Sequence, residues 1–359
     1  MLEDSFSGEW GKETGINPVP VLRTANFNED GTFDYTTPAM RYISANKVSR
    51  KAMKRGDIVL EKSGGTPNRP VGIMAYYDSD ALALCSNFNH VLRFNAKSSN
   101  SRYMFYQLRW LKEQSAFEPY TRKTTGLQNL QMKSFIDIPL KCPDLDTQNE
   151  RANTLRLIQE LIGVQSTCQD RLDQLIKSRF VEMFRDPLVG NAKWPRKTLG
   201  DRCRIITGNT PSRKNEKNYG NYIEWCKTDN ITESKYLTRA AECLSESGAE
   251  SGRIVPAGSI LMACIAGSLK SIGKVAVADR PVAFNQQINA LIPGTDFITN
   301  YLLWALKLSK DYLCSDVNMQ LKGILNKSTL SEKVFAIPPI DLQRQFSDFV
   351  EQVDKSRFA

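Results

Sequence analysis

Apolar residues spaced alternately by three and four mark one long stretch of the chain, residues 148–185. This spacing is the a/d pattern of a helix that packs lengthwise against a second helix. Thr147 and Glu150 have the spacing of a capping box at its start, and Pro187 follows its end. The stretch therefore predicts a helix of about 38 residues, which at about 1.5 Å per residue is roughly 57 Å long.

The segments on either side of this helix repeat one pattern of strands, polar loops and an amphipathic helix. The matched segments are 23–26 with 227–230, 54–59 with 256–261, 71–74 with 272–275, 86–89 with 284–287, 103–114 with 301–312, and 136–139 with 335–338. The first copy has no counterpart of residues 194–212, because only 20 residues precede Val21. We therefore expect the first copy to lack a strand and a loop.

This repeat predicts an α+β fold, with two mixed α/β domains in a pseudo-twofold repeat, each followed by a helix. The expected parts are a first domain at 1–145 (short at its N-terminus), a central helix at 146–187, a second domain at 188–340 and a truncated distal helix at 341–359. If a dyad relates the copies, the helices form an antiparallel coiled coil. The residues expected to pack the helix pair are Leu161, Leu172, Leu175, Phe346, Phe349 and Val353.

The charge of the chain lies in the two repeated segments. The formal net charge is +9, of which residues 1–145 carry +4 and residues 194–340 carry +6, whereas the two helices carry 0 and −1. Two basic domains joined through a neutral helix indicate a polyanion held at two places. DNA has a local dyad that fits such a repeat. A plain duplication without a ligand is the alternative.

Several function classes lack their sequence signals. The sequence has no HExxH motif, P-loop or adenine-methyltransferase Asn-Pro-Pro-Tyr, and its single histidine, His90, favours no catalytic triad. The eight cysteines are scattered without a CxxC, which indicates reduced core residues rather than a metal site. No run of about 18 apolar residues or signal peptide occurs. We expect no catalytic residue, metal, cofactor or membrane contact, and a cytoplasmic location.

Several stretches resemble the specificity (S) subunit of type I restriction–modification enzymes. Residues 172–187, LDQLIKSRFVEMFRDP, are similar to the central region of that family. The other similar stretches, which resemble parts of its target-recognition domains, are 8–12, 21–27, 61–65, 194–201, 206–212 and 337–343. The resemblance implies two target-recognition domains, each reading one half of a split double-stranded DNA sequence. It also implies helices that bind two methyltransferase (M) subunits, with restriction (R) subunits joining them.

The candidate DNA contacts are basic and polar residues on the matched loops. Arginine and lysine hold phosphates or read guanine, and asparagine and glutamine read adenine. The candidates in the first domain are Arg23, Asn26, Lys62, Ser63, Arg69, Arg122, Lys123, Thr125 and Gln128. Those in the second are Thr207, Asn209, Ser212, Arg213, Lys214, Lys227, Asn230, Lys270, Gln286 and Lys322. A solvated surface role is the alternative for each of them.

Two functional alternatives stay open. The short first domain and the truncated distal helix fit a truncated or cassette-type S fragment, which would act mainly as a docking scaffold for M subunits. An enzyme fused to its own specificity domain is a second alternative, which the missing catalytic motifs disfavour. DNA binding predicts a steep dependence on salt, whereas an apolar helical interface does not.

Overall fold

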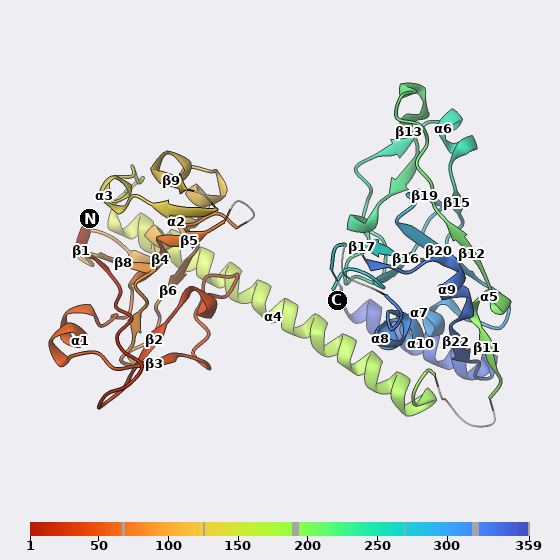
Figure 1. Ribbon diagram of the computed structural model, residues 1–359, viewed down its shortest axis with the longest axis horizontal. Coiled ribbons are helices and arrows are strands. Elements are labelled where there is room, and N and C mark those ends of the chain that lie inside the picture. The colour runs from red at the N-terminus through yellow and green to blue at the C-terminus, as the bar shows by residue number, and fades with distance from the viewer. Residues whose placement is uncertain (67–68, 125, 189–193, 269, 318–322, 358–359) are drawn as a thin grey trace. The chain divides into compact units, whose positions relative to one another are not determined.

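The computed structural model describes residues 1–66, 69–124, 126–188, 194–268, 270–317 and 323–357 (Figure 1). The chain divides into two compact units, Met1–Gln165 and Ser166–Ala359. The longest helix, α4 (Leu145–Phe184), crosses this division, so its first part belongs to the first unit and its last part to the second. None of the helices among the described residues is long and apolar enough to cross a membrane.

The first unit is built on a four-stranded antiparallel sheet in the order β1 (Leu2–Ser7), β8 (Asn89–Phe94), β4 (Ile58–Glu61) and β6 (Met74–Tyr76). Successive side chains of a strand point to opposite faces of its sheet. Ile58 and Leu60 accordingly join the cluster under α2 (Ser101–Glu113), whereas Val59 joins a cluster on the other face. That second cluster includes residues of β2 (Val19–Leu22) and β7 (Leu84–Cys85), which form a three-stranded sheet with β3 (Ala39–Arg41).

The second unit repeats this arrangement. Its central antiparallel sheet has the order β12 (Cys203–Thr207), β20 (Ile288–Pro293), β16 (Ile260–Ala263) and β18 (Val275–Val277). Ile260 and Met262 face the cluster with α7 (Thr299–Leu308), and Leu261 faces the opposite cluster. The second sheet has the order β14 (Cys243–Leu244), β13 (Tyr219–Cys226), β19 (Val282–Phe284) and β15 (Ile254–Val255). The α+β fold class with two repeated domains is confirmed.

Small sheets and short helices complete each unit. The first unit adds the sheet β5 (Ser63–Gly65), β10 (Leu127–Leu130) and β9 (Thr121–Thr124), with η1 (Thr24–Asn26), α1 (Ala45–Lys51), η2 (Glu118–Tyr120) and α3 (Met132–Phe135). The second adds the pairs β11 (Arg196–Thr198) with β22 (Val334–Ala336) and β17 (Ile265–Ala266) with β21 (Gly323–Ile324). Its helices are α5 (Leu199–Arg202), η3 (Glu216–Asn218), η4 (Thr228–Asn230), α6 (Glu246–Ser251), α8 (Lys310–Leu313), α9 (Lys327–Glu332) and α10 (Ile340–Ser356).

The strand expected to be missing from the first copy is present. β1 pairs antiparallel with β8, as β12 pairs with β20, so the two central sheets have the same order. The prediction was wrong because β1 carries only two large apolar residues, Leu2 and Phe6, among polar ones. Its sequence therefore gives no strand signal and no visible match to residues 203–207.

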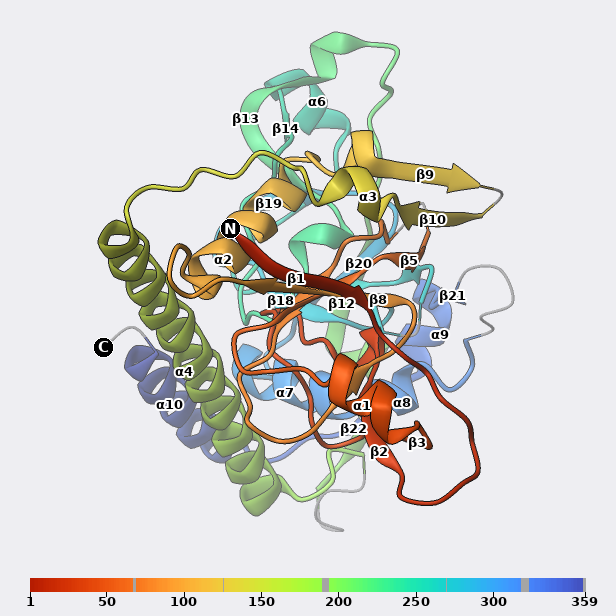
Figure 2. The ribbon, with the colours of Figure 1, turned by 90° about the vertical axis from the view of Figure 1, so that its left-hand side faces the viewer.

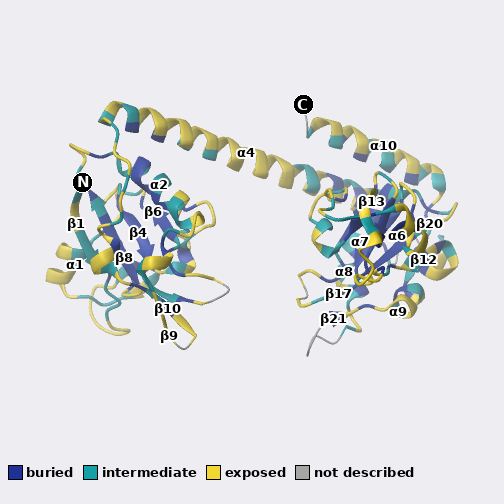
Figure 3. Cartoon of the chain, turned by 90° about the horizontal axis from the view of Figure 1, so that it is seen from above, coloured by how far each residue is buried: buried dark blue, intermediate teal, exposed yellow. Residues whose placement is uncertain are grey.

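The long helix is confirmed, and its C-terminal part packs against α10 (Figures 2 and 3). Phe346 of α10 contacts the rings of Phe180 and Phe184 at centroid distances of 5.3 and 5.5 Å. Further along α10, Arg357 forms an ion pair with Asp173. Residue numbers thus rise along α10 as they fall along α4, so this pair of helices is antiparallel.

The predicted packing residues of α4 require a correction. Leu161 is 68% exposed and Leu175 is 49% exposed, so neither packs the helix pair. Ile176 and the two phenylalanines of the previous paragraph are buried instead. The predicted heptad alternates steps of three and four residues. The buried residues instead follow one another at steps of four, beginning from the half-buried Leu172. On α10, Phe346 and Val353 are buried in the core of the second unit, and Phe349 is half-buried against it.

Candidate nucleic-acid interface

Several predicted contacts of the first unit meet at one edge of its central sheet. The carboxyl end of β4 leads through Lys62 into β5, where Ser63 lies beside β10. On the other side of β10, Lys123 of β9 lies opposite Gln128. The side chains of Arg122 and Lys123 are exposed and form no ion pair with another described residue. This hairpin therefore presents two available cations at the sheet edge, which suits contact with phosphates.

A partly buried chain of polar side chains holds Lys62 in place. Its Nζ donates to Ser7 Oγ at 2.7 Å, and that hydroxyl lies 3.4 Å from His90 Nδ1. The Nε2 atom of His90 lies 2.7 Å from Ser5 Oγ. Burial, together with the charge of Lys62, lowers the pKa of His90 to about 4, so the ring is neutral at pH 7. Burial also lowers the pKa of Lys62. His90 thus has a structural role at this edge.

The second unit concentrates its predicted contacts around one aromatic ring. Arg213 and Lys227 both pair with Glu242 and both lie over Trp225, at 5.4 and 5.3 Å from its centroid. The hydrogen bond from Lys227, followed by that from Arg213, lowers the pKa of Glu242, which is therefore ionised at pH 7. The side chains of Arg213 and Lys227 are 56% and 35% exposed, whereas the ring of Trp225 beneath them is buried. Lys214 is exposed beside it.

Three predicted base readers have internal roles instead. The Asn26 side chain is buried, accepts a hydrogen bond from Arg23 N at 2.9 Å and donates to two backbone carbonyls. Asn230 repeats this role by accepting from Lys227 N at 2.9 Å. The Asn209 side chain bridges the backbones of Ser251 and residue 253. These carboxamides form hydrogen bonds to backbone groups of turns that would otherwise be unpaired. They are therefore not available to bases.

Other predicted contacts are partly engaged within the protein. Gln128 is buried and accepts from Val71 N at 3.4 Å, so it is also unsuited to reading bases. Arg69 pairs at 3.1 Å with Glu61, a carboxylate whose pKa is raised by burial. Thr207 donates to Asn289 Oδ1 at 2.7 Å.

The remaining candidates are accessible or lie outside the description. Arg23, Ser212, Lys270 and Gln286 are exposed, and Ser63 is half-buried. Thr125 and Lys322 lie outside the described residues.

Sequence reasoning did not find two exposed apolar side chains at the same edge of the first unit. Phe88 is 55% exposed in the turn before β8, and Leu127 is 53% exposed at the start of β10. The available signal was an aromatic residue inside the polar run SNFN, which is unusual for a solvated turn.

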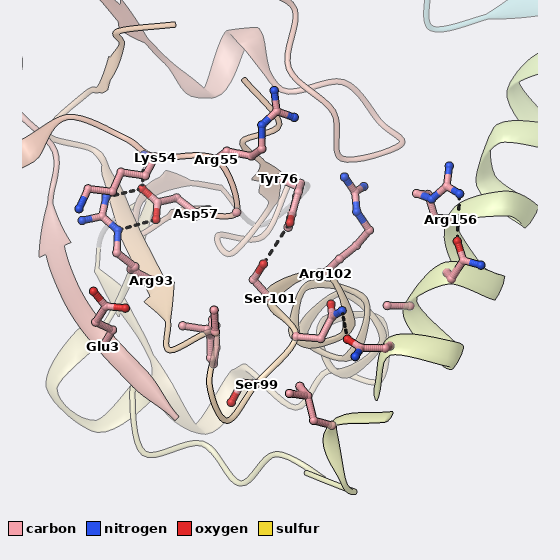
Figure 4. A pocket seen from close by; sticks show the side chains of 18 residues that line it. Glu3, Lys54, Arg55, Asp57, Tyr76, Arg93, Ser99, Ser101, Arg102 and Arg156 are labelled. Atoms are coloured by element: carbon pink, nitrogen blue, oxygen red, sulfur yellow. Dashed lines mark hydrogen bonds and ion pairs between the residues drawn. The ribbon is translucent and has the colours of Figure 1, made fainter. Parts of the chain in front are cut away.

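A basic cavity at the other end of the same sheet is a less suitable site (Figure 4). It has a volume of about 630 Å³, and arginines from several elements line it. Arg93 pairs at 2.7 Å with the buried Asp57, and Arg102 pairs at 2.6 Å with Asp78. These charges are already neutralised by partners within the chain, which indicates a structural role.

The two units define a tandem-repeat protein whose repeats present polar and basic turns at the same edge of a common α/β scaffold. The chain belongs to the family of type I restriction modification DNA specificity domains, whose profile matches residues 16–172 and 191–359.

Individual relatives support this assignment. The HindI specificity subunit of Haemophilus influenzae is 34% identical over 116 residues, which are 32% of this chain and 24% of that protein. The MjaIX specificity subunit of Methanocaldococcus jannaschii is 27% identical over 192 residues, covering 50% of this chain and 43% of the relative. The chain thus matches less than half the length of either relative.

The fold has a solved counterpart. The S subunit of a type I restriction–modification system from M. genitalium matches with a TM-score of 0.59 at 15% identity. The match covers 99% of this chain and 88% of that one. At this identity the likeness establishes the fold alone.

Proposed function

We propose that this chain is the non-catalytic specificity subunit of a type I restriction–modification enzyme. It binds a bipartite double-stranded DNA target and directs M and R subunits to that target. Methylation and ATP-dependent cleavage then belong to the partner chains. The observation that carries this proposal is the match of two specificity domains to one chain, each with its own scaffold and its own set of edge residues.

The distribution of side chains at the two edges supports sequence-specific reading. The edge of the first unit carries the unpaired cations of the β9–β10 hairpin and two exposed apolar residues. The edge of the second unit carries two cations that pair with Glu242 and lie over the ring of Trp225. Cations supply affinity for the phosphate backbone, and the neutral side chains between them can discriminate base edges. Different residues on one scaffold suit a target whose two halves differ in sequence.

The exposed face of α4 supports a protein partner. Leu155, Ile158 and Ile162 are exposed and line an apolar groove of about 850 Å³ that α4 forms with Trp110 of α2. Contiguous exposed apolar surface commonly marks a protein interface. We assign this face to the M subunits, two per chain, with R subunits joining the assembly. The cytoplasm, where DNA and these subunits meet, is the proposed location.

Mapping of methylated adenines tests the proposal. The chain is co-expressed with a type I M subunit, and modified adenines are located genome-wide. The expected result is a split motif, with two specific blocks around an unspecific gap. Absence of new methylation while M still co-purifies would support the docking-scaffold alternative. Failure of M to co-purify would contradict the assigned partner.

Salt dependence separates DNA reading from the scaffold alternative. Binding of the chain to its target duplex is measured between 50 and 200 mM salt. If about six phosphates are contacted, the affinity falls roughly 10³-fold over that range. An affinity for DNA that does not change with salt would contradict the proposal, whatever the strength of binding to M.

A further inference from the structure

The two units share one turn at the edge described above, which we name the tip turn. It comprises residues 86–89 in the first unit and 285–288 in the second, so the sequence match of 86–89 with 284–287 was wrong by one residue. In the first, Asn89 N donates to Ser86 O at 2.9 Å, and in the second Ile288 N donates to Asn285 O at 3.2 Å. Both turns therefore close in the same way immediately before the central strand of their sheet.

The neighbouring backbone holds both tip turns identically. The carbonyl oxygen of Phe88 accepts from Lys62 N and Ser63 N at 2.9 and 3.2 Å. The carbonyl oxygen of Gln287 accepts from the first two residues after β16, at 2.8 and 3.2 Å. Each turn is thus tied to the end of the adjacent strand through the same pair of hydrogen bonds, which fixes its position in the sheet.

A glycine lies against each tip turn at the same place. Gly8 N donates to Asn89 O at 3.1 Å, and Gly208 N donates to Ile288 O at 3.0 Å. A Cβ atom on Gly8 would lie 2.2 Å from Ser86 O, and one on Gly208 would lie 2.2 Å from Asn285 O. Neither close approach is possible for another residue without movement of the backbone. Both units therefore preserve a tightly packed frame around the turn.

The side chains on this common frame differ. The first tip turn exposes Asn87 and the ring of Phe88. The second exposes Gln286, whose Oε1 accepts a hydrogen bond from the Thr210 hydroxyl. Gln287 is turned inward by comparison, because its Oε1 accepts from Asn285 Nδ2 at 3.1 Å. One scaffold thus presents an aromatic face in one unit and a fixed carboxamide in the other.

We propose that the tip turn is a base-reading element of each unit, with Phe88 contacting a thymine methyl group and Gln286 reading an adenine. This inference rests on the proposed function and names the bases that its two edges would recognise. In the major groove, an apolar side chain distinguishes thymine by its methyl group, and a glutamine pairs with adenine N6 and N7. The frame keeps each reader in place, so discrimination does not require the turn to order on binding.

The geometry at Gln286 suits this role. A carbonyl oxygen has two lone pairs, so Oε1 can accept from Thr210 and from adenine N6 together. The amide nitrogen then donates to adenine N7. Thr210 holds the carboxamide in one orientation and so acts as a positioning residue.

Single-residue variants of the full chain, co-expressed with the M subunit, test the inference by methylation mapping. Phe88→Ala should lower the preference for thymine at one position about tenfold, and Phe88→Leu should retain it. Gln286→Glu should shift one position of the other half from adenine to cytosine, because a carboxylate accepts from cytosine N4. Matched controls are Leu82→Ala, an exposed apolar residue outside the turn, and Gln352→Ala on α10, and both should leave the motif unchanged.

The outcomes separate the inference from the proposed function. If the unaltered chain yields no split motif, the proposed function fails and the inference with it. If the unaltered chain yields a split motif that Phe88→Ala and Gln286→Glu leave unchanged, only the inference is overturned. The same conclusion follows if either variant, with an unchanged melting temperature, alters both halves or weakens every sequence equally. Changes confined to one position in different halves support it.

Discussion

At the scale of single residues, adjacent residues of the same chemical type differ in how far they are buried. Leu175 and Ile176 are adjacent apolar residues of α4, yet the first is half exposed and the second is buried in the core of the second unit. The rings of Phe180 and Tyr301 stack at 5.5 Å close to this position, so the helix is fixed in rotation by contacts outside the helix pair. The stability of the unit therefore depends on which of the two residues is changed.

Ile176→Asp should lower the free energy of unfolding by more than about 4 kcal/mol, because it buries an unpaired charge. Leu175→Asp is the matched control and should change it by less than about 1 kcal/mol, as is usual for surface substitutions. Denaturant titration of the full chain measures both effects, through the unfolding transition of the second unit. Equal effects of the two substitutions would contradict the rotation of α4 described above.

His90 links the stability of the first unit to pH. Its folded-state pKa of about 4 lies below the usual 6.5, so protonation favours the unfolded chain. The stabilisation is complete above pH 6.5 and is lost as the pH falls towards 4, by about 2 to 3 kcal/mol. His90→Asn, which introduces the residue found at the matching position 289, should remove this component.

The measurement is the free energy of unfolding of the unaltered chain and of His90→Asn at pH 7.5 and at pH 4.5. Because His90 is the only histidine of the chain, the difference between the two proteins isolates its titration from that of the carboxylates. Parallel losses of stability in both proteins would mean that His90 does not stay neutral in the folded unit.

At the scale of elements, the two halves of α4 meet different surroundings. In the second unit, Phe180 and Phe184 fill the space against Tyr301 of α7, at centroid distances of 5.5 and 4.8 Å. In the first unit, the matching tyrosine of α2, Tyr103, lines the open apolar groove instead. An apolar helix thus covers the tyrosine at this position in the second repeat, which supports the assignment of the groove in the first repeat to an apolar partner.

Ile158→Asp should weaken co-purification of the M subunit at least tenfold while leaving the melting temperature unchanged, because Ile158 is already 47% exposed. Asn153→Asp introduces the same charge on the opposite side of the helix and serves as the control. Quantitative pull-down of the M subunit by the full chain measures both variants. Unchanged binding by Ile158→Asp would exclude this face as the docking surface.

At the scale of the whole molecule, each unit has its own core and its own edge of candidate contacts. The excess positive charge is divided between the repeats, so each half of the proposed target has its own basic domain to contact. Two such surfaces on one chain also raise the affinity for a target that engages both. Changes at one edge should therefore leave the bases read by the other unaltered.

The double change Arg122→Ala with Lys123→Ala should reduce the slope of log affinity against log salt by about two. The methylation motif should keep its second half unchanged, because these cations belong to the first unit. Lys54→Ala with Lys97→Ala removes the same charge at the opposite ends of β4 and β8 and is the control. Loss of specificity in both halves would contradict independent reading by the two units.

The sequence by itself determined the long helix, the repeat, the α+β class and the family. The first three follow from local periodicity and from the order of matched segments, and the family follows from the resemblance of stretches such as residues 172–187. None of these inferences depends on side-chain contacts. The predicted cations at Arg122, Lys123 and Lys214 are also exposed, since charged side chains are seldom buried unless they are paired.

Only the tertiary structure decided the role of β1, the rotation of α4 and the use of the polar turn residues. β1 is defined by its pairing with β8, which is distant in sequence, and α4 is oriented by α7 and α10. Asn26 and Asn230 have a side chain of the type that reads bases, but their hydrogen bonds to backbone groups give them structural roles. Phe88 became a candidate because its exposed ring lies on a turn whose backbone hydrogen bonds match those of a turn in the second unit. A sequence pattern specifies which residue types are present, whereas the partners that engage or expose them depend on long-range contacts.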